Sequence, residues 1–521
     1  MRRLLVAVAV AGLVLPSSGA VPSSAPRVRV VVQGPADAVR RAGGRVTLDL
    51  PFVGAVAAEL SPYALARLAA DPAVRAVTPD DEVRVAAGTT VTDAAPPVRS
   101  VYREETGASY LQAHGINGAG VRVALVDTGV SDVPDLAGRI VDVTSPLPAH
   151  CVDLSGEGDC VDRYGHGTFL AGLIAGNGTS SGGAFAGMAP GAQLVSLKIA
   201  GRNGASDVSK VLAAIQWVVQ FHDQYGIRVL NLSLGTPSRV PYRFDPLNLA
   251  VEQAWRAGVA VVVAAGNSGP TNGTIAKPAD DPLVITVGAV DDRETTSRDD
   301  DALPAFSARG PTHDGLAKPD VVAPGAKLVS VRLPDSAIED QAGPGALAST
   351  YPAYRRGSGT SMAAAVTSGA VALLLQRHPD WSPDRVKYAL TATARGVAST
   401  DRRLVGNGLV QAHWATVAPV GVANQDVTVL SDGSGSLDGS RGGVVVGVCH
   451  DADECARCDA DATCVPVTGD ASWYGNSWLG NSWLGNSWLG NSWLGSSFYG
   501  EPEDDDYGTP ARGGAWYGAW L

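Results

Sequence analysis

Residues 121–129 read VRVALVDTG, and this stretch decides the fold. Apart from Arg122, the segment from Val121 to Val126 is apolar throughout, which is typical of a strand buried on both faces of a sheet. Asp127 follows directly at the carboxyl end of that segment. Open α/β sheets place their functional sites at the carboxyl ends of their strands. We therefore expect Asp127 to lie at the functional edge of a parallel sheet.

Apolar strand-like segments alternate with helical segments after this point. The alternation predicts an α/β fold of three layers, in which a mostly parallel sheet carries helices on both faces. The expected strands are residues 121–126, 194–199, 229–234, 259–265 and 284–290. The expected helices are residues 168–175, 207–221, 247–257, 361–377 and 383–394.

Three further motifs supply chemical groups that complement Asp127: Gly165-His166-Gly167-Thr168, Ala265-Gly266-Asn267-Ser268 and Gly359-Thr360-Ser361-Met362-Ala363. A serine hydroxyl becomes a nucleophile near neutral pH when a base takes its proton and a carboxylate orients that base. Asp127, His166 and Ser361 are the candidate catalytic carboxylate, base and nucleophile. Taken singly, Asp127 reads as a turn residue and Ser361 as a helix cap, but those interpretations do not explain why all the motifs occur together.

Two hydrogen-bond donors are candidates for an oxyanion hole. Ser361 begins an apolar helix, and the backbone amides at a helix N-terminus point toward any nearby anion. Asn267 follows the expected strand at 259–265 and offers its side-chain amide. The alternative for Asn267 is a turn residue beside Gly266.

These motifs, in the order Asp, His, Asn, Ser, resemble the subtilisin-like serine peptidases, and the resemblance covers about residues 100–416. It implies a catalytic domain that hydrolyses peptide bonds of extended polypeptides through an acyl-enzyme, without a cofactor for catalysis. It also implies two segments that pair with the substrate backbone and flank the specificity pocket. Their residues are Ser233, Leu234, Gly235, Ala264, Ala265 and Gly266.

The chain departs from the family pattern at two positions. Ala365 stands where the family usually has proline, and Thr236 stands where a second glycine is common. Both departures concern local geometry and pocket shape rather than a catalytic group. Members of the family often bind structural calcium, but no motif of this sequence identifies a metal site.

The N-terminal residues predict export. Residues 1–20 combine two arginines with an apolar run from Leu4 to Leu15 and small residues up to Ala20, which is typical of a secretory signal peptide. The run is too short to span a membrane. We therefore expect a secreted, extracellular protein with no transmembrane segment after signal removal.

Residues 27–88 predict a separate small α+β unit of the ferredoxin-like kind, with strands and helices in a split β-α-β order. The unit is similar to the inhibitor-type propeptide of subtilisin-like zymogens. In that interpretation it is an inhibitory partner of the catalytic domain, and segments near 74–77 and 83–85 close it as strands. The alternative is a small permanent domain.

Cysteines occur in two groups, and an exported chain favours disulfides. Cys151 and Cys160 bracket a glycine-rich loop before His166, so we predict that they pair with each other. Residues 417–470 form an extension that contains the second group, Cys449, Cys455, Cys458 and Cys464, among several aspartates. Two disulfides of undetermined connectivity are the favoured interpretation, with zinc or calcium as alternatives.

Residues 471–521 contain tryptophan-rich pentapeptide repeats, such as Asn476-Ser477-Trp478-Leu479-Gly480, and an acidic tail. The repeats indicate either an aromatic surface for sugars, cell surfaces or self-association, or a low-complexity tail without a partner.

The chain carries 52 acidic and 40 basic residues, and this net acidic charge disfavours a nucleic-acid binder.

Together these features predict a secreted serine endopeptidase that is made as a self-processing zymogen. The alternative from another class is a catalytically silent protein that presents its tryptophan-rich repeats to a surface. Self-cleavage after the propeptide would separate the two.

Overall fold

The computed structural model describes residues 27–434, except 70, 81, 86–98, 146, 343–345, 348–350 and 398, together with residues 445–447 and 464–466. The predicted signal peptide at 1–20, the repeats at 471–521 and most of the cysteine-containing extension lie outside the described residues. Within the extension, β20 (Val445–Gly447) pairs in parallel with β21 (Cys464–Pro466).

The centre of the molecule is a seven-stranded sheet of order β16-β15-β14-β12-β6-β10-β9, in which every pair of neighbours is parallel. Its strands are β6 (Arg122–Asp127), β9 (Cys151–Asp153), β10 (Gln193–Lys198), β12 (Ile227–Leu232), β14 (Ala260–Ala264), β15 (Ile285–Val290) and β16 (Val321–Pro324). Apolar runs produce these strands because both faces of the sheet are covered. The five predicted strands are present, and β9 and β16 add to them.

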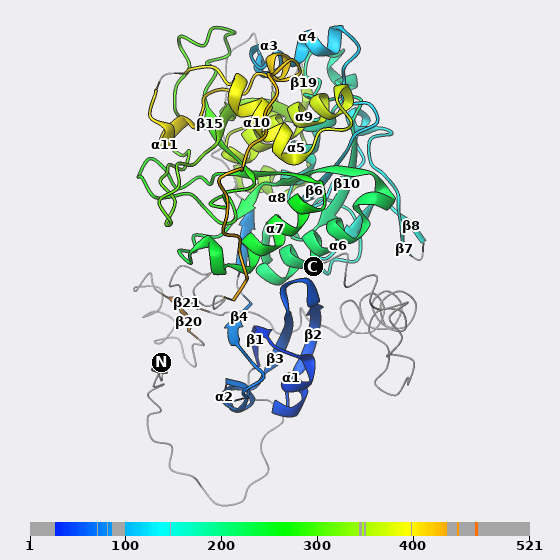
Figure 1. Cartoon of the computed structure of the whole chain (residues 1–521). Helices are drawn as coiled ribbons and strands as arrows, with labels where there is room; N and C mark the ends of the chain where they lie inside the picture. The colour runs from blue at the N-terminus through cyan, green and yellow to red at the C-terminus, as the bar shows by residue number, and fades with distance from the viewer. Residues whose placement is uncertain are drawn as a thin grey trace, which may run out of the picture.

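Helices cover both faces of the sheet (Figure 1). One layer contains α5 and α9 and the opposite layer contains α6 and α7, so the predicted three-layer α/β architecture is confirmed. The long helices are α5 (His166–Ala175), α6 (Val208–Tyr225), α7 (Pro246–Arg256), α9 (Thr360–Arg377) and α10 (Pro383–Thr393). Almost every residue of α9 is buried, which agrees with its apolar sequence.

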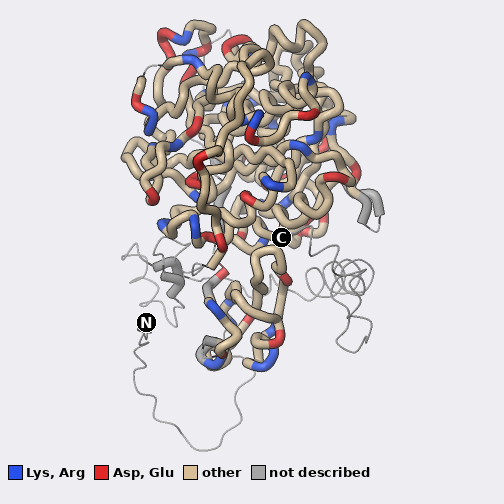
Figure 2. The backbone as a smooth tube through the Cα atoms, in the orientation of Figure 1, with Lys and Arg blue, Asp and Glu red and all other residues tan. Residues whose placement is uncertain are grey.

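Shorter elements surround this body. They are α3 (Tyr102–Glu105), α4 (Ala108–Ala113), β7 (Val143–Ser145), β8 (Leu147–Ala149), β17 (Leu328–Val331), α8 (Ala337–Ala342), β18 (Ala346–Leu347), β19 (Tyr351–Gly357), α11 (Arg402–Val405) and α12 (Ala412–Ala415). Strands β17, β19 and β18 form a small sheet, and β19 leads directly into α9. Acidic and basic residues are interspersed along the described backbone (Figure 2).

The N-terminal unit is a four-stranded antiparallel sheet of order β2-β3-β1-β4. Its elements are β1 (Val28–Gln33), α1 (Ala36–Ala42), β2 (Arg45–Leu50), the 3-10 turn η1 (Pro51–Val53), β3 (Ala55–Leu60), α2 (Pro62–Ala69) and β4 (Ala76–Pro79). Val30, Val39 and Leu60 belong to a small core of this unit. Leu48, Leu50 and Val53 instead join the main core, because β2 packs on α6 and η1 packs on α7.

The strand after this unit differs from the prediction. Residues 83–85 were expected to close the N-terminal unit, but β5 (Glu82–Val85) lies outside its sheet. It forms the middle of a separate sheet between β11 (Ala205–Asp207) and β13 (Leu234–Gly235), and both pairings are antiparallel. The unit is therefore tied to the larger body by its packing on α6 and α7 and by a strand pairing.

Candidate active site

Asp127 and His166 meet at the carboxyl edge of the central sheet. Asp127 is the last residue of β6, and His166 is the first residue of α5. The Nδ1 atom of His166 lies 2.8 Å from Oδ1 and 3.0 Å from Oδ2 of Asp127, and both side chains are buried. The Thr128 backbone amide also donates to Asp127 Oδ1, at 2.8 Å. The carboxylate can thus hold the imidazole with a proton on Nδ1.

The environment of His166 favours the role of a base. Burial alone lowers the pKa of the imidazole, but the charges of Asp127 and Asp162 and the hydrogen bond to Asp127 outweigh it and raise that pKa above its ordinary value. With the Nδ1 proton facing Asp127, the neutral ring carries its lone pair on Nε2. Among the described residues Nε2 is buried and has no hydrogen-bond partner.

Glycines on both sides of His166 allow this close approach. Gly165 has a φ of 100°, in the region that favours glycine. A Cβ atom on Gly167 would lie 2.1 Å from the carbonyl oxygen of Gly129 and 3.2 Å from Asp127 Oδ1. A side chain at position 167 would therefore push the helix away from Asp127.

Asp162 is a residue of the site that the sequence analysis did not identify. Its buried carboxylate accepts hydrogen bonds from the Gly165 amide at 2.7 Å and from the Thr168 amide and hydroxyl at 2.8 and 2.7 Å. It also accepts from the Thr128 hydroxyl at 2.8 Å, so it links the residue after Asp127 to the first turn of the helix of His166. The N-cap residue of α5 is Gly165, so Asp162 does not occupy the usual capping position, and only its place shortly before an apolar helix marked it in the sequence.

Ser361 lies in the first turn of α9, as predicted, and is buried. Its hydroxyl donates to the backbone oxygen of Ser233 at 3.3 Å. Ser233 lies between β12 and β13, so the structure brings this predicted substrate-binding residue next to the candidate nucleophile.

Asn267 is fixed beside Ser361 by Thr360. Its Oδ1 accepts from the Thr360 backbone amide at 2.9 Å and from the Thr360 hydroxyl at 2.9 Å. A backbone N–H can only donate, so the atom facing it must be the amide oxygen. The amide nitrogen of Asn267 consequently points away from Thr360, which is the orientation an oxyanion donor needs.

The two predicted substrate-binding segments lie at this edge but differ in their contacts. Leu234 and Gly235 pair with Val85 and Arg84 of β5. The other segment begins with Ala264, the last residue of β14, and continues through Ala265 and Gly266. The backbone amide of Ala265 donates to the backbone oxygen of Val287, and the backbone amide of Gly266 donates to the hydroxyl oxygen of Thr360. No pairing of these three with β5 is found among the described residues, so their contact with substrate stays a prediction.

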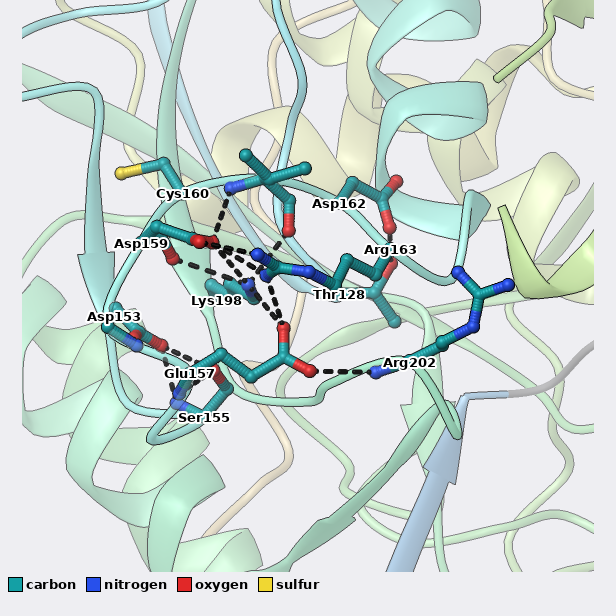
Figure 3. Close-up of polar contacts among 12 residues, drawn as sticks. Thr128, Asp153, Ser155, Glu157, Asp159, Cys160, Asp162, Arg163, Lys198 and Arg202 are labelled. Atoms are coloured by element: carbon teal, nitrogen blue, oxygen red, sulfur yellow. Dashed lines mark hydrogen bonds and ion pairs between the residues drawn. The ribbon is translucent and has the colours of Figure 1, made fainter. Parts of the chain in front are cut away.

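Cys151 and Cys160 form the predicted disulfide, with Cα atoms 5.6 Å apart. The loop between them carries a cluster of charged side chains around Lys198 (Figure 3).

Within the described ranges, no group of three or more His, Cys, Asp or Glu side chains is arranged to hold a metal ion. Structural calcium therefore stays an expectation without an assigned site. No helix in the described part of the chain is both long and apolar enough to cross a bilayer.

An aspartate, a histidine and a serine at the carboxyl edge of a parallel α/β sheet are typical of the serine hydrolases that have an α/β fold. Comparisons with known proteins narrow this class. Residues 118–408 match the model of the subtilase family. The chain is 40% identical over 303 residues to serine protease AprX of Bacillus subtilis, a match that covers 57% of this chain and 66% of AprX.

Two further relatives agree. An alkaline protease of Alkalihalobacillus alcalophilus is 34% identical over 370 residues, which cover 71% of this chain and 80% of the relative. The crystal structure of fervidolysin from Fervidobacterium pennivorans, a keratinolytic enzyme related to subtilisin, matches with a TM-score of 0.59 at 25% identity and covers 77% of this chain and 63% of fervidolysin. The chain thus spans about two thirds of the length of AprX and of fervidolysin. The chain belongs to the subtilase family of serine peptidases.

Proposed function

We propose that this protein is a secreted serine endopeptidase that hydrolyses peptide bonds through an acyl-enzyme on Ser361. The observation that carries the proposal is the buried contact of 2.8 Å between Asp127 and His166 at the sheet edge where Ser361 also lies. Membership of the subtilase family supports the same reaction. The predicted signal peptide supports secretion.

In the proposed first step the hydroxyl of Ser361 turns from Ser233 O to Nε2 of His166 and gives up its proton as it attacks the scissile carbonyl. Asp127 keeps the other ring nitrogen protonated and stabilises the imidazolium. The Ser361 backbone N–H and the Asn267 side-chain amide bind the oxyanion of the tetrahedral intermediate. His166 then protonates the leaving amine. In the second half of the reaction His166 takes a proton from the water that attacks the acyl-enzyme and returns it to the Ser361 oxygen as the acid product leaves.

The position of β5 supports a zymogen. This strand of the N-terminal segment runs antiparallel between β11 and β13, as an extended substrate would. Two of its neighbours, Leu234 and Gly235, belong to the predicted substrate-binding set. We propose that residues 27–88 are an inhibitory propeptide whose last strand fills the cleft, and that extended polypeptides bind there after its removal.

A comparison of secreted wild type with a Ser361→Ala variant tests this proposal. The N-terminus of each mature product is determined by mass spectrometry, and each is assayed on an unfolded protein substrate. We expect only the wild type to lose residues up to the region of 85–110 and to cleave the substrate. Identical N-termini without turnover would favour a catalytically silent protein that presents its tryptophan-rich repeats to a surface.

A further inference from the structure

Lys198 is a buried cation at the catalytic edge of the sheet. It is the last residue of β10, where it pairs with Asp127 of β6 on one side and with Asp153 of β9 on the other. Its side chain is 0% exposed. Removing an ammonium group from water is costly unless nearby groups compensate for the lost hydration. The contacts of Lys198 Nζ therefore indicate what this residue does.

Four oxygen atoms surround Lys198 Nζ, and all belong to the loop that precedes His166 (Figure 3). Glu157 Oε2 lies at 2.7 Å and the backbone oxygen of Val161 at 2.8 Å. The backbone oxygen and Oδ1 of Asp159 both lie at 3.3 Å. Carboxylate and carbonyl oxygens in such a set are the ligands that proteins otherwise offer to a hard metal ion.

Neighbouring charges keep this set ionised. Burial raises the pKa of Glu157, but hydrogen bonds and the charge of Lys198, with contributions from Arg202 and Arg163, outweigh it, so the net effect lowers that pKa. The pKa of Asp159 is also below its ordinary value, chiefly because Arg163 donates hydrogen bonds to this carboxylate, one of them of 2.6 Å from Arg163 Nη2 to Asp159 Oδ2. Two cationic side chains thus face two carboxylates in one network.

The network continues into the catalytic site. Val161, which accepts from Lys198, is followed by Asp162, whose carboxylate holds the first turn of the helix of His166. A Cβ atom on Gly129 would lie 3.0 Å from the Cys160 backbone oxygen and 3.3 Å from Lys198 Cδ. The loop before His166 and the segment after Asp127 therefore pack against the same lysine side chain.

We propose that Lys198 is a positioning residue whose ammonium acts as a built-in cation that orders residues 153–163 and so sets His166 against Asp127. Its effect on turnover rests on the proposed function, whereas its effect on the loop does not. The same geometry implies that a shorter, neutral side chain at position 198 would leave an oxygen-lined space open to a divalent cation.

The test compares Lys198→Ala with Lys387→Ala in the full-length chain. Lys387 is a matched control because its buried Nζ is also held by oxygens, from Pro282, Leu283, Val284 and Asp320, but on residues outside the candidate site.

Mature folded protein is assayed for kcat and KM on a peptide substrate, with millimolar calcium or with a chelator. We expect Lys198→Ala to lose about 10²-fold in kcat with less change in KM, and calcium to restore part of it. Lys387→Ala should keep its kcat and show no calcium response. An unchanged kcat in folded Lys198→Ala would overturn the proposal.

Amide hydrogen exchange gives a readout that needs no turnover. In a Ser361→Ala background, Lys198→Ala should speed exchange across residues 153–168, and calcium should slow it again. If Lys198→Ala does not fold, Glu157→Gln removes one carboxylate of the set and should speed exchange in the same segment. Unchanged exchange in the variant that folds would overturn the proposal. An inactive wild type would refute the proposed function while leaving this exchange measurement decisive for Lys198.

Discussion

The amide oxygen of Asn267 accepts two hydrogen bonds from Thr360, the residue immediately before Ser361. One residue thereby fixes the candidate oxyanion donor and also begins the helix that carries the candidate nucleophile. A preorganised donor stabilises the transition state because it need not reorient as the charge develops.

Replacing Asn267 should therefore reduce turnover more than binding. For Asn267→Leu we expect kcat to fall by about 10²–10³-fold with little change in KM, because the lost donor acts on the oxyanion and not on the ground-state substrate. Steady-state kinetics on a peptide substrate measure this. Thr360→Val, which keeps Asn267 but removes the hydroxyl donor, should cause a smaller loss. Equal losses in kcat and in substrate affinity would contradict the oxyanion assignment.

Asp162→Asn should change both stability and the pH profile. The amide cannot accept all the hydrogen bonds that the carboxylate accepts, so we expect the free energy of unfolding to fall by about 1–3 kcal/mol. Asp162 also contributes to raising the pKa of His166, which must be neutral to act as a base. Removing its charge lowers that pKa, and the acidic limb of the kcat profile should move to lower pH.

The exposed Asp299 provides the control for this charge effect. Asp299→Asn removes the same charge from a residue that does not contribute to the pKa of His166, so its pH profile should match that of the wild type. A shift of the acidic limb toward higher pH in Asp162→Asn would contradict the electrostatic argument.

The sequence predicted the central sheet and the helices well because long apolar runs must be buried, whichever neighbours they acquire. Helix α5 begins two residues earlier than expected, at His166, since Gly165 ends the preceding loop in a positive-φ conformation. The candidate site was predictable because its residues follow strand ends or begin helices. Such positions are marked locally by glycines and short polar residues.

Contacts between distant segments were not predictable in this way. The pattern of residues 83–85 indicates a strand but not its partner, and β5 pairs with β11 and β13 instead of the sheet of its own unit. The role of Lys198 likewise depends on a loop about 40 residues earlier in the chain. The alternation of strands and helices along the chain and the amino-acid composition contain no information on the partners of β5 or on the partners of Lys198.

The disulfide should stabilise the loop before His166. Cys151 and Cys160 lie 9 positions apart in the sequence, and closing a loop of this size contributes about 2–3 kcal/mol through the unfolded chain. A Cys151→Ser/Cys160→Ser variant in a Ser361→Ala background should therefore unfold at a lower urea concentration. An unchanged midpoint would indicate that the ion pairs of the loop suffice to hold it.

Glu252 should make the free energy of unfolding fall as the pH rises toward 8. Its carboxylate on α7 is buried and accepts from the Ser431 amide at 2.9 and 3.0 Å. Burial, and then the charge of Asp281, raise the pKa of Glu252 to about 8. Because the unfolded value is about 4.3, the folded state holds more protons between these two pH values, and unfolding becomes easier as pH increases.

Urea unfolding of Ser361→Ala chains across this pH range measures the effect. Glu252→Gln cannot ionise and can still accept from Ser431, so we expect a weaker dependence of stability on pH and a more stable protein than its parent near pH 8. Glu104→Gln, at an exposed position on α3, should leave the pH dependence as it was. If Glu252→Gln retained the full dependence, other buried acids would have to carry it, with Glu105, whose pKa burial and the charge of Asp301 raise to about 10, the first to replace.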